Sequence, residues 1–240
     1  MAFFQEQGSR QPFLRAPPVV LWLIAILIGA HALRVFVFAQ QSDTLFVTYG
    51  FVPARYSSVF LATHAVDPGT WLDRALPFVT YMFLHGGFAH VAINSVWLLA
   101  FGPVVARRFG TLLFLIFFLV CGIGGAAAHL VSNWGSTAPV IGASAAISGL
   151  MAAGFRMLRA ASEGRERALA PIFSRQILVW TALWAGVNVI AGVTGLGAGG
   201  GVQLVAWQAH LGGYATGLVL AGVFDVFAAG GPARSSAPQA

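Results

Sequence analysis

Long apolar stretches separated by short polar segments dominate the chain. About 20 apolar residues cross the hydrocarbon of a bilayer as a helix, and six stretches have roughly that length, at residues 19–39, 77–105, 112–131, 142–158, 177–193 and 204–227. The pattern predicts an all-α membrane protein, a bundle of six transmembrane helices. A cleaved signal peptide is an alternative for the first stretch, because basic residues precede it. That stretch is long for a signal peptide, and no clear small-x-small cleavage site follows it.

The polar segments set the limits of the domain. Residues 1–17 and 229–240 are expected to be tails, which leaves 18–228 as a single six-helix core. Residues 40–75 are too polar to cross the bilayer and too apolar for a free linker. We expect them to fold as a loop on the membrane surface, with aromatic side chains near the lipid headgroups. These side chains are Tyr56, Phe60 and Trp71. The glycine-rich residues 197–201 predict a flexible connection.

The composition excludes a soluble protein. Charged residues make up 8% of the 240 residues, against about 25% in soluble domains, so the chain could not cover a water-facing surface. All 13 basic residues are arginines, and they stand at the ends of apolar stretches. This placement favours membrane topology over nucleic-acid binding as the origin of the net charge of +6. The single cysteine, Cys121, excludes an internal disulfide and a thiolate metal cluster.

The arginines also predict the orientation in the membrane. With the N-terminus inside, ten arginines fall on the inner side and three on the outer side, as expected if both termini are cytoplasmic. The absence of lysine and the wealth of alanine indicate a GC-rich bacterial genome, and hence the bacterial inner membrane. The same orientation brings four polar residues from three stretches to a similar depth, in the outer half of the membrane. They are His90, Asn94, Ser144 and His210.

Ser144 and His210 have the chemistry of a nucleophile and its base. A serine hydroxyl becomes nucleophilic when a histidine takes its proton. The acidic residue of the apolar stretches, Asp225, lies about four turns beyond His210, which is too far for a third catalytic member. The residues therefore predict a dyad rather than a triad. A serine in a membrane helix more often bonds to its own backbone, and Ser148 is interpreted in that way.

Other residues near Ser144 could stabilise the oxyanion of an acyl transfer. His90 and Asn94 are four residues apart and share one helix face. They could donate hydrogen bonds through a ring N–H and a side-chain amide. Ser144 opens its helix, where backbone N–H groups are free and the helix dipole favours negative charge. Gly142 lets the backbone turn tightly just before it.

Small residues at every fourth position predict that two of the helices pack closely. They occur in the stretches 142–158 and 204–227, and close packing there would bring Ser144 to His210. The residues are Ala145 and Gly149 in the first stretch, and Ala209, Gly213, Gly217 and Ala221 in the second.

Three motifs resemble the rhomboid family of intramembrane serine proteases. They are HGGFAHVAIN at 85–94, GAS at 142–144 and AHLGGYATG at 209–217. Their order and spacing match the family, and together they are highly specific. The resemblance covers about 18–228 and implies a rhomboid-like bundle of six helices, with 40–75 as a membrane-embedded first loop.

The resemblance also implies roles for individual residues. Ser144 would be the nucleophile and His210 the base. His90 and Asn94 would assist the oxyanion, and His85 would belong to the polar network beside them.

The resemblance also extends to helix packing, although the chain departs from the family pattern at some positions. The resemblance implies that Gly213 and Gly217 pack helices, and that 177–193 with the following glycines forms a lateral gate for a substrate helix. Ser148 occupies the place of an aromatic residue that stacks on the histidine in many members, so His210 must be held differently. The positions that leave the common pattern are Ala106, Ala145 and Ser148.

The leading hypothesis is an intramembrane serine endopeptidase in the lipid bilayer that cleaves single-span or polytopic membrane proteins, with no metal, cofactor or nucleic acid. The alternative is a catalytically inactive rhomboid-like protein that binds membrane clients. A transporter using His85, His90 and His210 is disfavoured, because the chain has no internal repeat or charged ion site. A metal site is disfavoured because the HExxH pattern is absent and no carboxylate is near.

Overall fold

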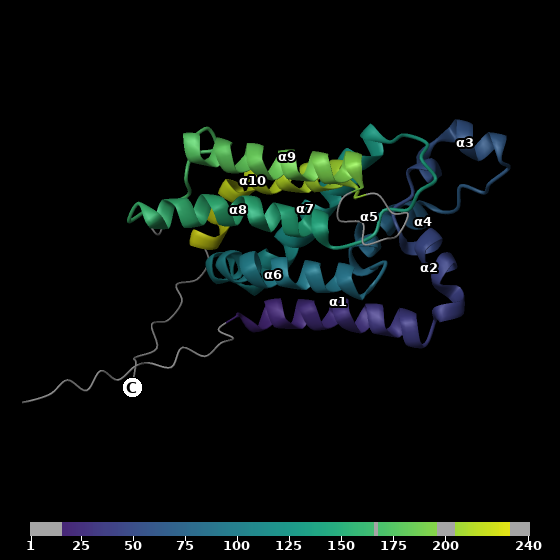
Figure 1. The fold of residues 1–240 in the computed structure, drawn as a ribbon, viewed down its shortest axis with the longest axis horizontal. Helices are drawn as coiled ribbons and strands as arrows, with labels where there is room; N and C mark the ends of the chain where they lie inside the picture. The colour runs from purple at the N-terminus through teal and green to yellow at the C-terminus, as the bar shows by residue number, and fades with distance from the viewer. Residues whose placement is uncertain (1–15, 166–167, 196–204, 231–240) are drawn as a thin grey trace, which may run out of the picture.

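The computed structural model describes residues 16–165, 168–195 and 205–230, which form a helical bundle (Figure 1). Five described helices are long and apolar enough to cross a membrane. They are α1 (Pro18–Phe36), α6 (Phe88–Phe109), α7 (Thr111–Ser132), α9 (Arg175–Thr194) and α10 (Trp207–Ala229). In the described ranges there is no strand, only an isolated bridge between Phe51 and Val140. The prediction of an all-α membrane bundle is confirmed.

The remaining predicted span, α8 (Ser144–Ser162), lies at the centre of the bundle. It has 19 residues, as α1 has, but it is not among the five most apolar helices. Thirteen of its residues are buried, because α6, α7 and α10 all pack against it. A helix enclosed by protein needs small side chains for close packing rather than large apolar ones for contact with lipid, and α8 is rich in alanine and glycine.

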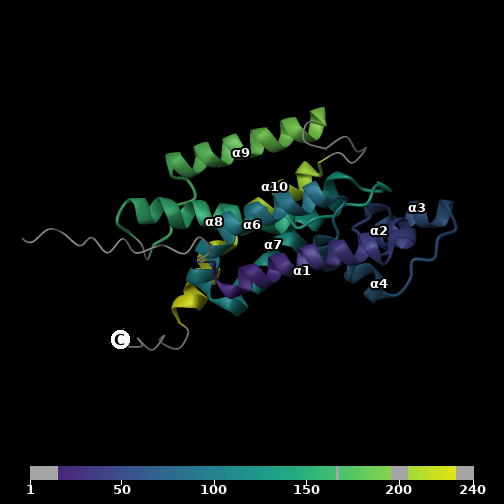
Figure 2. The ribbon, with the colours of Figure 1, turned by 60° about the horizontal axis from the view of Figure 1, so that its bottom comes forward.

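The helix α9 is the opposite case. Only Ile177 and Gly192 are buried along its 20 residues, and it lies along the outside of the bundle (Figure 2). Its exposed side chains are large and apolar, including Leu183, Val187 and Ile190. This helix is therefore built to face lipid on most of its surface.

The second predicted span differs from the expectation. The sequence predicts one helix over 77–105, but the chain forms α5 (Pro77–Thr80), the 3-10 turn η3 (Tyr81–Phe83) and only then α6. Gly86 and Gly87 explain the break, since glycine is a poor helix former. Gly87 is extended, with φ −169° and ψ 170°. Hydropathy detects the apolar character of this segment but not its interruption.

The loop between α1 and α5 folds at one end of the bundle (Figure 1). It contains η1 (Ala39–Gln41), α2 (Ser42–Tyr49), η2 (Pro53–Tyr56), α3 (Ser58–Thr63) and α4 (Trp71–Ala75). Phe51 and Val140 exchange two backbone hydrogen bonds, with N···O distances of 2.9 and 2.8 Å. These bonds attach the loop to the segment that leads into α8, so the loop helps to position the start of that helix.

The start of α1 and the end of α10 lie at the other end of the bundle (Figure 1). Several arginines stand in the helix ends and the connection at this end, namely Arg107, Arg108, Arg156, Arg159, Arg165 and Arg175. Nearly all of the two predicted tails, and the glycine-rich residues 197–201, lie outside the described residues.

Candidate active site

Ser144 is the first residue of α8, and a glycine shapes the chain before it. Gly142 has φ +115°, a conformation that side chains with a Cβ rarely adopt. Its N–H donates to the carbonyl of Tyr81 over 2.9 Å. Ala143 caps the helix without a side-chain hydrogen bond, so the first N–H groups of α8 have no partner within the helix. Ser144 therefore stands beside backbone donors at the positive end of the helix dipole.

The side chain of Ser144 meets His210 directly. His210 lies in the first turn of α10, and its Nε2 is 2.6 Å from the Oγ of Ser144. Both residues are half-buried. The sequence predicts that these two residues share a site. In the structure a hydrogen bond joins them, although they are 66 positions apart.

Glycines let α8 and α10 approach backbone to backbone. A Cβ placed on Gly213 would lie 2.0 Å from the carbonyl oxygen of Ala145, and one on Gly217 would lie 2.3 Å from that of Gly149. Side chains cannot be accommodated at such distances. The contact therefore fixes the separation of the two helices, and with it the separation of the serine and the histidine.

A third polar side chain lies in contact with His210, and the sequence patterns did not single it out. Asn188, on α9, places its Oδ1 2.7 Å from the Nδ1 of His210. Its Nδ2 donates to the backbone carbonyl of Trp184 over 2.9 Å. One signal was present in the sequence, because an amide inside an apolar stretch needs a hydrogen-bond partner.

These hydrogen bonds determine how His210 is protonated. The Nδ2 of Asn188 faces a carbonyl, so Oδ1 is the atom that faces His210. An oxygen accepts, and Nδ1 must therefore carry the proton. In the neutral ring this leaves the lone pair on Nε2, pointing at the hydroxyl of Ser144. The ring is in the state required to accept a proton from the serine.

His90 takes the opposite tautomer. The backbone N–H of Gly86 donates to its Nδ1 over 3.4 Å, so Nε2 carries the proton in the neutral ring. A Cβ on Gly142 would lie 2.7 Å from this Nε2, which places the ring against the turn that precedes Ser144. His90 thus presents an N–H donor beside the candidate nucleophile.

Asn94 and His85 contact His90 rather than Ser144. Asn94 is buried, and its Nδ2 donates to the carbonyl of His90 over 3.0 Å, which uses one of its two hydrogens. His85 is buried with its ring centroid 5.0 Å from that of His90, and its carbonyl accepts from the Nδ1 of His31 over 3.1 Å. Asn94 and His85 thus flank His90 and support its position.

Ser148 and Asp225 take no part in this cluster. The hydroxyl of Ser148 donates to the carbonyl of Ser144 over 2.7 Å, which is the backbone bond that the sequence predicts for it. Asp225 lies in the last turns of α10, where its Oδ1 is 2.5 Å from the Nε of Arg108. It therefore ties α10 to α6 at the end opposite the serine.

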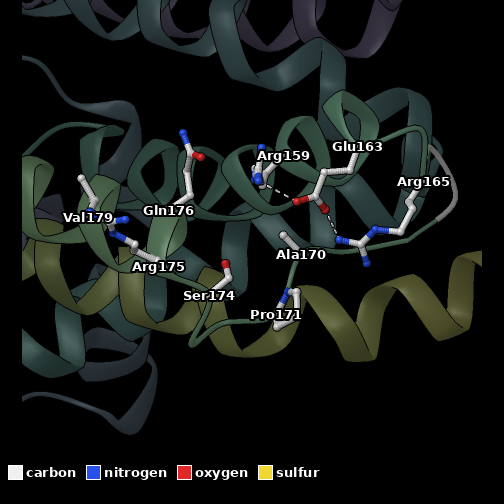
Figure 3. A pocket seen from close by; sticks show the side chains of 9 residues that line it. All are labelled: Arg159, Glu163, Arg165, Ala170, Pro171, Ser174, Arg175, Gln176 and Val179. Atoms are coloured by element: carbon white, nitrogen blue, oxygen red, sulfur yellow. Dashed lines mark hydrogen bonds and ion pairs between the residues drawn. The ribbon is translucent and has the colours of Figure 1, made fainter.

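A cavity of about 410 Å³ opens between the end of α8 and the start of α9 (Figure 3). Glu163 pairs there with Arg159 and Arg165, and the hydrogen bond from Arg165 lowers the pKa of this carboxyl. Arg159 is 15 residues beyond Ser144, about 22 Å along the helix. The cavity is therefore remote from the serine and is not its substrate site.

The fold and the cluster define a class, namely a helical membrane protein that holds a hydrogen-bonded serine and histidine between two closely packed helices. The model of the Rhomboid domain matches residues 72–225. These residues include α6 to α9, most of α10 and the whole cluster. The chain belongs to the rhomboid family.

Individual relatives agree with this assignment. The chain is 32% identical over 166 residues to the Rhomboid protease GluP of Bacillus subtilis (strain 168), which covers 69% of this chain and 28% of that protein. It is 28% identical over 227 residues to the Rhomboid-like protein 11, chloroplastic, of Arabidopsis thaliana, covering 93% and 71%. A 47-residue segment is 47% identical to the RHOMBOID-like protein 9, chloroplastic, of the same plant, covering 20% and 11%. The chain thus spans about a tenth of one relative and about a quarter of the Bacillus protease.

Proposed function

We propose that the protein is an intramembrane serine endopeptidase, with Ser144 as nucleophile and His210 as general base. The observation that carries this proposal is the 2.6 Å contact between Ser144 Oγ and an unprotonated His210 Nε2. The Bacillus relative, which bears the name of a rhomboid protease, supports it.

The geometry suits acyl transfer in two steps. His210 accepts the proton of Ser144 as Oγ attacks the scissile carbonyl, and the imidazolium then protonates the leaving amine. The oxyanion is stabilised by the N–H on His90 Nε2 and by backbone N–H groups at the start of α8, with the second amide hydrogen of Asn94 as a further donor. Gly142 leaves room for the ring of His90. Water, activated by His210 in turn, releases the acyl product.

The substrates we propose are single-span or polytopic membrane proteins, cut where small residues loosen a transmembrane helix. The core would be residues 18–228 between tails 1–17 and 229–240. Both tails would lie in the cytoplasm, because α1 begins and α10 ends at the arginine-rich end of the bundle. In a bacterium this is the inner membrane, and the site would then draw its water from the outer side.

A catalytically inactive rhomboid-like protein is the second candidate, favoured by Ala145 in place of the family's usual glycine. The packing argues against a defect at this position. A Cβ on Gly125 of α7 would lie 2.6 Å from the methyl group of Ala145. The missing side chain at Gly125 therefore provides the room that this methyl group needs, away from the serine hydroxyl.

The test combines cleavage with chemical labelling. The purified protein should cleave a model single-span substrate, and a fluorophosphonate should label it at Ser144. Ser144→Ala and His210→Ala should each lower cleavage by at least about a thousandfold, and each should abolish labelling. Cleavage that survives in Ser144→Ala would refute the assignment, and an unlabelled but folded wild-type protein would favour the inactive candidate.

A further inference from the structure

We propose that Asn188 is a positioning residue for the base, and that α9 is therefore part of the active site. The inference rests on the proposed function and extends it from a pair of residues to a chain of four groups. This chain runs from the carbonyl of Trp184 through Asn188 and His210 to Ser144.

Each hydrogen bond in this chain fixes the next. The carbonyl of Trp184 accepts from Nδ2 of Asn188, which turns Oδ1 toward His210. Oδ1 accepts from the N–H on Nδ1, which leaves the lone pair of Nε2 for the hydroxyl of Ser144. Without Asn188, no other group in this series of hydrogen bonds selects between the two tautomers of His210. The wrong tautomer would present an N–H to the serine and could not take its proton.

The acceptor also serves the ring after it has been protonated. When His210 takes the proton of Ser144, the ring becomes a cation with both nitrogens as donors. The Oδ1 of Asn188 keeps its bond to Nδ1 in that state, so the imidazolium is stabilised where it forms. A neutral amide does this without placing a second charge in the membrane, where an unpaired carboxylate would be costly.

Side-chain contacts hold α9 in the register that this bond requires. One turn along α10 from His210, Tyr214 stacks on Trp184 with ring centroids 4.4 Å apart and an angle of 16°. The hydroxyl of Tyr214 lies 2.8 Å from Oγ1 of Thr181. Thr181, Trp184 and Asn188 thus form one face of α9 turned toward α10.

Because α9 is largely exposed, its contact with α10 holds His210 less firmly than the contact between α8 and α10 does. The base is correctly oriented only while α9 lies against α10. Any displacement of α9 from α10 would release Asn188 from His210. The position of this helix therefore determines the state of the base.

The test compares Asn188→Leu with Asn188→Asp and Thr181→Val in the full chain. Leucine removes the acceptor and keeps a similar volume, whereas aspartate retains an oxygen in the same place. Thr181→Val is the matched control, because it deletes a hydrogen bond of the same helix contact without touching His210. Three readouts are needed: kcat and KM for a single-span substrate, the rate of fluorophosphonate labelling, and ¹⁵N shifts of the histidine rings. The His210 signals are assigned by their loss in His210→Ala.

We expect Asn188→Leu to lower kcat and the labelling rate by about 10- to 100-fold, with KM nearly unchanged. The ¹⁵N shifts should show that the proton has left Nδ1 of His210. Asn188→Asp should retain the proton on Nδ1 and recover part of the lost rate. Thr181→Val should keep the wild-type ¹⁵N pattern and change kcat by no more than a few-fold.

Three results would overturn the inference while leaving the proposed function intact. The first is a wild-type kcat and labelling rate in Asn188→Leu. The second is an unchanged His210 tautomer in that variant, and the third is an equal loss of kcat in Thr181→Val; either of these reduces Asn188 to a packing residue. Failure of the proposed function looks different, since the wild-type protein itself would then neither cleave nor be labelled.

Discussion

Two contacts of α10 hold the cluster together, and they are built in different ways. Against α8, the backbones touch, because Gly213 and Gly217 leave no side chain between the helices. Against α9, side chains bridge the gap: Trp184 stacks on Tyr214, and Asn188 bonds to His210. We call these the α8–α10 contact and the α9–α10 contact.

The two contacts meet two different requirements of the site. The α8–α10 contact brings the serine to the histidine, and it cannot loosen without loss of close packing along much of both helices. The α9–α10 contact fixes the orientation of the histidine, and it depends on a few side chains of an exposed helix. The distance between Ser144 and His210 is thus set by the close packing of the fold. The orientation of His210 can change with the position of α9.

The largest effect is expected from a methyl group in the α8–α10 contact. Gly213→Ala would place its Cβ 2.0 Å from the carbonyl oxygen of Ala145, so the helices must separate. We expect a loss of about 3 kcal/mol in the free energy of unfolding. Activity should fall by about a hundredfold, since a misplacement of ~1 Å has that effect. Thermal unfolding in detergent and the cleavage assay measure both quantities.

Gly222→Ala on the same helix is the matched control. A Cβ at Gly222 meets nothing within 4 Å, and alanine is the better helix former by about 1 kcal/mol. This variant should be as stable as the wild type or slightly more so, with unchanged activity. Equal effects of the two substitutions would contradict the idea that the α8–α10 contact determines the site.

Hydropathy and motif spacing alone predict much of this arrangement. The spans follow from runs of apolar residues, and the fourfold spacing of small residues pointed to the α8–α10 contact. The arginine distribution predicts a common depth for Ser144 and His210, and a hydrogen bond joins these two residues in the structure. The break before α6 could not be predicted in this way, because Gly86 and Gly87 lie in a segment that is largely apolar on both sides.

Asn188 shows why the α9–α10 contact was harder to predict. A single amide hardly changes the hydropathy of a 20-residue helix, and it belongs to no repeated pattern. Its position could be inferred from the predicted spans, because the end of 177–193 falls on the same side as the start of 142–158. Because Ser148 stands in place of an aromatic residue, the sequence predicts that another group must hold His210. Asn188 is such a group, since its side chain bonds to the ring.

An intermediate effect is expected from the α9–α10 contact. Trp184→Ala removes the ring that stacks on Tyr214, a pair worth about 1 kcal/mol beyond its buried area. We expect α9 to dock less of the time and kcat to fall by up to about fivefold, since 1 kcal/mol corresponds to that factor. Leu183→Ala is the control, because Leu183 is 64% exposed on the lipid-facing side of the same helix. A loss after Trp184→Ala as large as that after Gly213→Ala would remove the distinction between the two contacts.

The smallest effect is expected from the second hydroxyl of α8. Ser148 is buried, but its hydroxyl bonds back to the carbonyl of Ser144 in its own helix, and that carbonyl also accepts the helical N–H. Ser148→Ala should therefore change the free energy of unfolding by less than about 0.5 kcal/mol and leave cleavage within about twofold of wild type. Thr181→Val should be more destabilising, by about 1 kcal/mol, although Thr181 lies on the more exposed helix, because its hydroxyl bonds across to Tyr214. If Ser148→Ala proved the more damaging of the two, hydrogen bonds within α8 would contribute to the position of Ser144. The backbone contact with α10 would then not be sufficient to explain it.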